Sequence, residues 1–197
     1  MIEEKIYEEN PQYEQRKTLF ELFKDGETDI VFVGDSITEK CEWQEFYKDK
    51  VVCNRGIGSD MSEGVLNRLE TVVDLNPKKI FIMIGINDLG KEINSDKTMA
   101  NYQEIIHTLK KLLPESEIYI ESILPVEKIS SIKNEDVQKL NTKIKALSEQ
   151  ENLEYINLYD LMVDETNHLK DDYSVDGVHL TGEAYQIWID AISEYAK

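Results

Sequence analysis

Cysteine and histidine are scarce in this sequence. Its 197 residues include two cysteines, Cys41 and Cys53, and three histidines. Two cysteines outside a C-x-x-C pair provide neither a disulfide framework nor a metal-binding spacing, so we expect both to be reduced and structural. Without a cluster of histidine, cysteine and carboxylate residues, the sequence predicts no metal site and no cofactor.

Long apolar runs are also missing. No run approaches the roughly 20 residues that a membrane-spanning helix needs. The first five residues lack the basic start and the apolar stretch of a secretory signal. We therefore expect a cytoplasmic protein without stable membrane association.

Basic residues are few compared with acidic ones. The chain has 22 lysines and arginines against 40 aspartates and glutamates, which gives a net charge of −18. A negative field of this size repels nucleic-acid phosphates and anionic lipid surfaces. The charge excludes nucleic acid as a partner and favours a small molecule.

Short β-rich runs alternate with longer segments of helical period, and no repeat or flexible linker interrupts them. The predicted strands cover residues 29–33, 50–53, 79–84, 117–120 and 154–158, and the predicted helices cover 11–23, 62–74, 97–113, 134–151 and 181–195. This order predicts an α/β fold, a three-layer α/β/α sandwich around a flavodoxin-like, doubly wound, five-stranded parallel sheet. We expect one domain over residues 1–197, with 1–27 as an N-terminal helical extension packed on it.

In such sheets, ligands bind beyond the carboxyl ends of the strands, so the segments after the strands are candidate sites. Ser36 follows the first strand, at a strand-to-helix turn that exposes its hydroxyl; a simple helix N-cap is the alternative interpretation. Gly56 and Gly58 follow the second strand, where the backbone can approach a ligand, or form a flexible turn. Asn87 follows the third strand, and its neutral amide suits an oxyanion, although Asn-Asp pairs also form turns.

Asp176 and His179 lie three residues apart near the C-terminus. On a compact loop the carboxylate can fix the imidazole tautomer and stabilise the imidazolium; an Asp-Gly turn with an incidental histidine is the alternative. Together the four segments contain a nucleophile, a base, an acid that orients the base, and oxyanion donors. No G-x-S-x-G elbow occurs in the sequence, which argues against the α/β-hydrolase fold.

These motifs, from Val33 to His179, resemble those of the SGNH, or GDSL-like, hydrolase family. The segment 34–38, Gly-Asp-Ser-Ile-Thr, resembles the nucleophile motif and implies Ser36 as nucleophile. The segment 85–88, Gly-Ile-Asn-Asp, resembles the asparagine motif and implies Asn87 as an oxyanion donor. The segment 176–179, Asp-Gly-Val-His, resembles the last motif and implies His179 as base, oriented by Asp176.

The glycine motif departs from the family pattern. Family members commonly read Gly-Gly-Asp or Ser-Gly-Asp where this chain reads Gly-Ser-Asp over residues 58–60. The family's oxyanion glycine aligns best with Ser59, and Gly58 precedes it. Because the donor is a backbone N–H, a serine can replace the glycine if the local dihedrals permit. We expect Ser59 to donate together with the Ser36 N–H, and the choice between Gly58 and Ser59 stays open at this stage.

The overall pattern is similar to the platelet-activating-factor acetylhydrolase-like and carbohydrate-esterase branches of the family. A compact chain without long insertions and an acidic surface favour a short acyl group, most plausibly acetyl, on a soluble alcohol such as a sugar. Lysophospholipid or thioester hydrolysis is the alternative within the same chemistry. A non-catalytic, anion-binding module of flavodoxin-like shape is the alternative from a different class. The aromatics Trp43, Tyr47, Tyr173 and Trp188 are candidates for a pocket or a homodimer surface, with core packing favoured for Trp188.

Overall fold

The computed structural model describes residue 7 and residues 10–23, 27–127 and 132–197. A single five-stranded parallel sheet in the order β2-β1-β3-β4-β5 forms its centre. The strands are β1 (Ile30–Gly34), β2 (Val52–Gly56), β3 (Lys79–Met83), β4 (Glu117–Glu121) and β5 (Glu154–Ile156). The predicted α/β fold with a five-stranded, doubly wound parallel sheet is confirmed.

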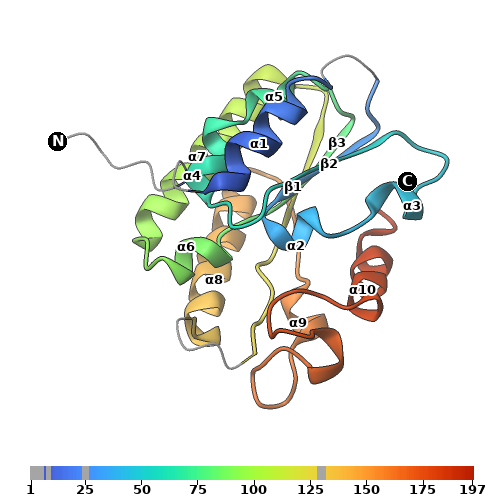
Figure 1. Ribbon diagram of the computed structural model, residues 1–197. Helices are drawn as coiled ribbons and strands as arrows, with labels where there is room; N and C mark the ends of the chain where they lie inside the picture. The colour runs from blue at the N-terminus through green and yellow to red at the C-terminus, as the bar shows by residue number, and fades with distance from the viewer. Residues whose placement is uncertain (1–6, 8–9, 24–26, 128–131) are drawn as a thin grey trace.

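Helices cover both faces of the sheet (Figure 1). They are α1 (Pro11–Phe20), α2 (Ser36–Glu39), α3 (Trp43–Phe46), α4 (Ser62–Asn67), α5 (Glu70–Val73), α6 (Ile86–Gly90), α7 (Ser95–Leu112), α8 (Asn134–Gln150), α9 (Tyr159–Met162) and α10 (Gly182–Ile192), with a 3₁₀ turn over Asp171–Tyr173. In Figure 1, α4, α7 and α8 lie on one side of the sheet, and α3 and α10 lie on the other. This is the three-layer arrangement that the strand–helix alternation predicts.

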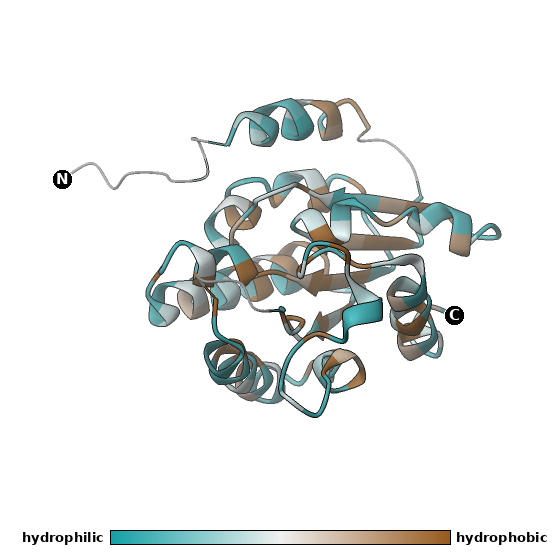
Figure 2. Cartoon of the chain, turned by 60° about the horizontal axis from the view of Figure 1, so that its bottom comes forward, coloured by the Kyte–Doolittle hydropathy of each residue, from teal (hydrophilic) through white to brown (hydrophobic). Residues whose placement is uncertain are grey.

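The hydrophobic core lies along the strands, which are brown in Figure 2. Phe32, Phe81 and Tyr119 occupy one row across β1, β3 and β4, and their rings stack with centroids 5.1 and 4.7 Å apart. Trp43 stacks on Phe32 at 3.6 Å, and Trp188 meets Trp43 edge-on at 5.0 Å. Both indoles are almost fully buried, so they belong to the core and not to a pocket or dimer surface.

The single helix predicted over 62–74 is wrong in one respect, because the segment forms two short helices, α4 and α5. Between them Arg68 turns inward, and its guanidinium donates to Asp60 Oδ2 at 2.7 Å and to the Gly34 carbonyl at 3.0 Å. The periodicity of the apolar residues indicates helix throughout, but it carries no information about this buried ion pair.

The N-terminal helix begins where the sequence predicts, although it ends at Phe20, three residues early. Asn10 caps it by accepting a hydrogen bond from the Gln12 N–H at 3.0 Å. Residues 1–6, 8–9 and 24–26 of the predicted extension lie outside the described residues. Cys41 is buried and Cys53 half-buried, and both are free thiols.

Candidate active site

Ser36 stands at the start of α2, immediately beyond the carboxyl end of β1. Asp35 caps this helix by accepting a hydrogen bond from the Ile37 N–H at 2.9 Å. Gly34 ends β1 beside Met83 of β3, and a Cβ on Gly34 would lie 2.5 Å from the Met83 carbonyl oxygen, which only glycine avoids. The strand, the glycine and the cap together place Ser36, which is half-buried, at the carboxyl end of β1.

His179 and Asp176 lie on a loop that runs from the 3₁₀ turn to α10. The Ser174 hydroxyl closes this loop, because it donates to the His179 carbonyl at 2.7 Å and accepts from the Gly177 N–H at 2.9 Å. Gly177 has a φ of +84°, a conformation that favours glycine. The loop is therefore shaped by its own hydrogen bonds.

Asp176 accepts hydrogen bonds from several groups of this loop. Its Oδ2 lies 2.6 Å from His179 Nδ1, and its Oδ1 accepts from the backbone N–H groups of His179 and Val178 at 2.8 and 3.0 Å. The His179 side chain, more than any other group, lowers the pKa of the Asp176 carboxyl below its ordinary value of 3.8. An ionised Asp176 keeps the proton of the imidazole on Nδ1 and leaves Nε2 free to accept a proton.

The two chain segments meet at the start of α2 (Figure 1). His179 Nε2 lies 2.9 Å from Ser36 Oγ, which completes a hydrogen-bonded chain of Ser36, His179 and Asp176. The structure thus brings together the three residues predicted as nucleophile, base and orienting acid.

Ser59 lies in a turn over residues 57–60, closed by a hydrogen bond from the Asp60 N–H to the Ile57 carbonyl at 3.1 Å. Ser59 is exposed and has a φ of +59°. A positive φ at the third position, with none at Gly58, is the pattern of a type II turn, which favours glycine there. Serine therefore adopts the conformation of the glycine it replaces. No described residue accepts a hydrogen bond from its N–H.

Asn87 lies in the first turn of α6, after Gly85, whose φ of +127° requires glycine. Its Nδ2 donates to the Asp60 carbonyl at 2.9 Å. A primary amide has two N–H groups, so this bond orients the side chain and leaves a second donor. Asn87 and the 57–60 turn are consequently held against each other.

Three further carboxyl groups are buried behind these residues, and none of them was predicted as a site residue. Asp60 pairs with Arg68, and both side chains are fully buried. Asp88 accepts from the Ser62 N–H at 3.0 Å and fixes the start of α4. Burial raises the pKa of Asp35 to about 7. The acidic residues next to the motif serines and asparagine, at positions 35, 60 and 88, were the available signal for this support.

Over the described ranges, no group of three histidine, cysteine or carboxylate residues could hold a metal ion. In the same part of the chain, no helix combines the length and the apolar character needed to cross a bilayer.

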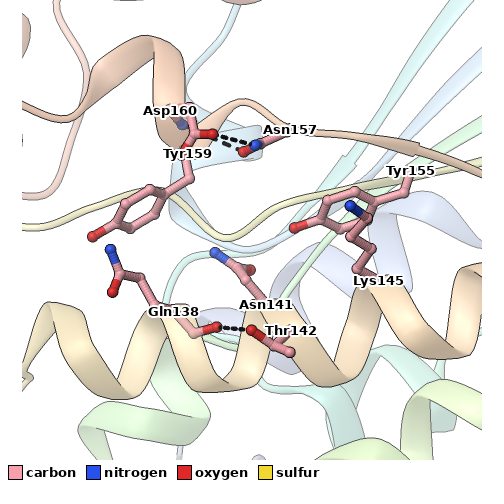
Figure 3. Close-up of a pocket in the computed structure, with 8 residues that line it drawn as sticks. All are labelled: Gln138, Asn141, Thr142, Lys145, Tyr155, Asn157, Tyr159 and Asp160. Atoms are coloured by element: carbon pink, nitrogen blue, oxygen red, sulfur yellow. Dashed lines mark hydrogen bonds between the residues drawn. The ribbon is translucent and has the colours of Figure 1, made fainter.

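A separate pocket of about 320 Å³ lies between α8 and the segment from β5 to α9 (Figure 3). It is lined by Gln138, Asn141, Thr142, Lys145, Tyr155, Asn157, Tyr159 and Asp160, none of which is a predicted site residue. Two of the side-chain amides that line it are hydrogen-bonded to other groups of the protein. Asn141 bonds to the backbone N–H and the carbonyl of Ile123, both at 2.8 Å, and Asn157 donates to Asp160 at 2.6 Å.

A serine, a histidine and an aspartate joined by hydrogen bonds at the carboxyl edge of a parallel sheet define the class of serine hydrolases. Within this class the particular family is identified by residues 32–187, which match the GDSL-like Lipase/Acylhydrolase family; the chain belongs to this family. Membership makes it a carboxylic ester hydrolase by class, as the motifs predict.

Two relatives from Rattus norvegicus are subunits of platelet-activating factor acetylhydrolase IB. The alpha1 subunit is 30% identical over 108 residues, which cover 52% of this chain and 46% of the relative. The alpha2 subunit is 26% identical over 170 residues, which cover 82% and 73%. The chain thus spans about half the length of the first of these relatives.

Solved structures share the fold over nearly the whole chain. A Streptococcus pneumonia protein whose name relates it to platelet activating factor has a TM-score of 0.89 at 29% identity, covering 94% of this chain and 93% of that one. A GDSL-like lipase from Bacteroides thetaiotaomicron has a TM-score of 0.82 at 28% identity, covering 93% and 96%. An acetyl xylan esterase has a TM-score of 0.69 at 22% identity, covering 85% and 98%, and at this identity the likeness concerns the fold alone.

Proposed function

We propose that the protein hydrolyses short-chain carboxylic esters through an acyl-enzyme on Ser36, and that its substrate is an O-acetylated carbohydrate or a similar small soluble molecule. The observation that carries the proposal is the hydrogen-bonded chain from Ser36 Oγ through His179 to Asp176, with distances of 2.9 and 2.6 Å. No cofactor or metal takes part in the proposed mechanism.

In the first step, His179 Nε2 takes the proton of Ser36 while Oγ bonds to the ester carbonyl carbon. Asp176 stabilises the imidazolium that forms. The imidazolium then gives its proton to the leaving alcohol as the C–O bond of the ester breaks. Water, deprotonated by His179, attacks the acyl-enzyme in the same way and releases the carboxylic acid and free Ser36.

The negative oxygen of each tetrahedral intermediate needs hydrogen-bond donors. We assign this role to the N–H groups of Ser36 and Ser59 and to the free N–H of the Asn87 amide. Ser59 is preferred to Gly58 because it is exposed, whereas Gly58 is buried below Gln12. The bond from Asn87 to the Asp60 carbonyl at 2.9 Å supports a site in which these donors share one small volume.

The short acyl group is supported by the name of the rat relatives, which are acetylhydrolases. The soluble alcohol is supported by the net charge of −18, which disfavours anionic lipid surfaces. Lysophospholipid or thioester hydrolysis would use the same Ser36 chemistry and is separated from this proposal by the choice of substrate.

Labelling and turnover test the reaction class on one sample. A fluorophosphonate should label the protein once, at Ser36, and abolish hydrolysis of p-nitrophenyl acetate. Ser36→Ala should lose both, whereas Ser193→Ala, at an exposed serine beyond α10, should keep both. Tight anion binding without label or turnover in the folded protein would support the anion-binding module instead.

Acyl-chain length tests the substrate. We expect kcat/KM to fall from p-nitrophenyl acetate to the octanoate, and the protein to release acetate from acetylated xylooligosaccharides. A preference for chains of eight carbons or longer would contradict the acetyl proposal and favour a lysophospholipase.

A further inference from the structure

The turn that carries Ser59 rests on the N-terminal segment and not on the central core. Ile57 and Met61, on either side of the turn, are buried in a separate hydrophobic cluster with Tyr7, Tyr13 and Phe20. Three of the five members therefore come from the segment around α1, which lies beside α4 in Figure 1. The apolar flanks of the turn are held by a helix that lies outside the matched family region, residues 32–187.

Asn10 contacts the turn directly. Its Nδ2 donates to the Gly58 carbonyl at 2.6 Å, while its Oδ1 accepts from the Gln12 N–H and caps α1. The Gln12 side chain also covers Gly58, since a Cβ on this glycine would lie 2.5 Å from Gln12 Oε1. Both atoms of the Asn10 amide are thus in use, one for the helix and one for the turn.

The Gly58 carbonyl and the Ser59 N–H belong to one peptide unit. A trans peptide is planar, so its C=O and N–H point in opposite directions. A donor that fixes the Gly58 oxygen on the α1 side therefore directs the Ser59 N–H to the opposite side. A hydrogen bond to the carbonyl also polarises the peptide and strengthens its N–H as a donor.

This peptide is the central one of the 57–60 turn, and its orientation distinguishes a type II turn from a type I turn. Type II requires the positive φ observed at Ser59, +59°, which costs a non-glycine residue on the order of 1–2 kcal/mol. Type I is open to serine without this cost. Without an opposing contact, the peptide would turn over and direct the Ser59 N–H away.

We propose that Asn10 is a positioning residue that holds the Gly58–Ser59 peptide in the strained orientation and so presents the Ser59 N–H to the oxyanion. This inference rests on the proposed function. Arg16 adds a second contact from α1, because its Nε lies 3.1 Å from Glu39 Oε1 at the end of α2. The N-terminal helix thereby bridges the turn and the helix that begins with Ser36.

Asn10→Asp is the sharpest variant, because aspartate is as good an N-cap as asparagine but cannot donate to the Gly58 carbonyl. We expect kcat for p-nitrophenyl acetate to fall by about tenfold or more, while KM changes little. This loss is smaller than the loss of about 10²–10³ that follows the removal of a complete donor. Asn94→Asp is the matched control. Asn94 caps α7 by accepting from the Asp96 N–H at 2.8 Å, and its variant should retain wild-type kcat.

Rescue separates positioning from general stabilisation. Glycine tolerates the positive φ, so Asn10→Asp combined with Ser59→Gly should recover most of the kcat that Asn10→Asp alone loses. Equal kcat in Asn10→Asp and wild type, or no recovery in the double variant, would overturn the inference.

Crystal structures test the orientation of the peptide independently of any activity. We expect the Gly58–Ser59 peptide to be turned over in Asn10→Asp and to keep the wild-type orientation in the double variant. If the wild-type protein neither hydrolyses esters nor reacts with fluorophosphonate, the proposed function is wrong. The inference is then tested only by the orientation of this peptide in the crystal structures of wild type and Asn10→Asp. The same orientation in wild type and Asn10→Asp would show that Asn10 does not hold this peptide.

Discussion

Asn87 shows how much one side chain depends on its neighbours. The φ of +127° at Gly85 turns the chain from β3 into α6, and the hydrogen bond to the Asp60 carbonyl then fixes the amide plane. Its second N–H is therefore preorganised, which is the condition under which a donor stabilises a transition state more than a ground state. The functional group of Asn87 is local, but its direction is set by a residue 27 positions away.

Removing this amide should affect the rate and not the fold. We expect Asn87→Ala to lower kcat for p-nitrophenyl acetate by about 10²–10³, with a small change in KM. Asn157→Ala removes an exposed amide of the separate pocket that is hydrogen-bonded to Asp160, and it should leave kcat unchanged. A similar kcat for both variants would remove Asn87 from the oxyanion site.

At the scale of elements, the break between α4 and α5 is organised by the Asp60–Arg68 ion pair. Arg68 reaches from the break to the turn 57–60 through Asp60 and to the end of β1 through the Gly34 carbonyl. The pair is fully buried, so the attraction between the two charges has to compensate for the hydration that each of them loses. Three segments that meet at the site are thus joined by one guanidinium.

Breaking this pair should be costly. We expect Arg68→Met to lower the free energy of unfolding by roughly 3–5 kcal/mol, because Asp60 would remain buried without its partner. The exposed pair of Lys139 with Asp136 is the control, and Lys139→Met should change stability by less than about 1 kcal/mol. Urea unfolding measures both, and equal losses would contradict the role given to the buried pair.

At the scale of the whole molecule, Glu121 is a carboxyl group in the interior of an acidic protein. It ends β4, and its Oε1 accepts from the Trp188 indole of α10 at 2.6 Å. Burial, opposed by this hydrogen bond, raises the pKa of Glu121 to about 8, from an ordinary value of 4.5. Folding therefore keeps a proton on Glu121 at a pH where the unfolded chain releases it.

Glu121 should make stability fall as pH rises. Its contribution is fully present below about pH 4.5 and is lost as pH rises to about 8, because only the unfolded state releases the proton in this window. Glutamine cannot lose a proton, so Glu121→Gln should gain stability relative to wild type between about pH 5 and 8, on the order of a few kcal/mol. Urea unfolding at several pH values measures it.

The control for this prediction is Glu183→Gln, at an exposed glutamate on α10. Its stability should follow that of the wild type over the whole pH range. Parallel pH curves for wild type and Glu121→Gln would show that Glu121 is ionised in the folded protein.

Some whole-molecule expectations stay predictions. The cytoplasmic location is a sequence-based prediction that fractionation checks, and the choice between monomer and homodimer, which the sequence leaves open, is made by the mass of the protein in solution. The single domain over 1–197 includes segments outside the described residues, and limited proteolysis tests it.

The sequence by itself determined the sheet, the order of its elements and the residue types of the site. Alternating apolar runs and helical periods are local signals, and the carboxyl ends of parallel strands always share one edge. Ser36 and Asn87 could therefore be placed near one another before any coordinates, whereas His179 was assigned to the site by the resemblance of its motif. The short helices α3, α6 and α9 were not predicted, because four or five residues contain too few turns for a period to show.

Only the tertiary structure decided how the donors are directed. The positive φ of Ser59, the contact of Asn10 with the Gly58 carbonyl and the inward turn of Arg68 join residues far apart in the chain. Such contacts depend on the packing of several elements at once and leave no period or spacing in the sequence. The chemistry of the site is thus written in short motifs, and its geometry in long-range packing.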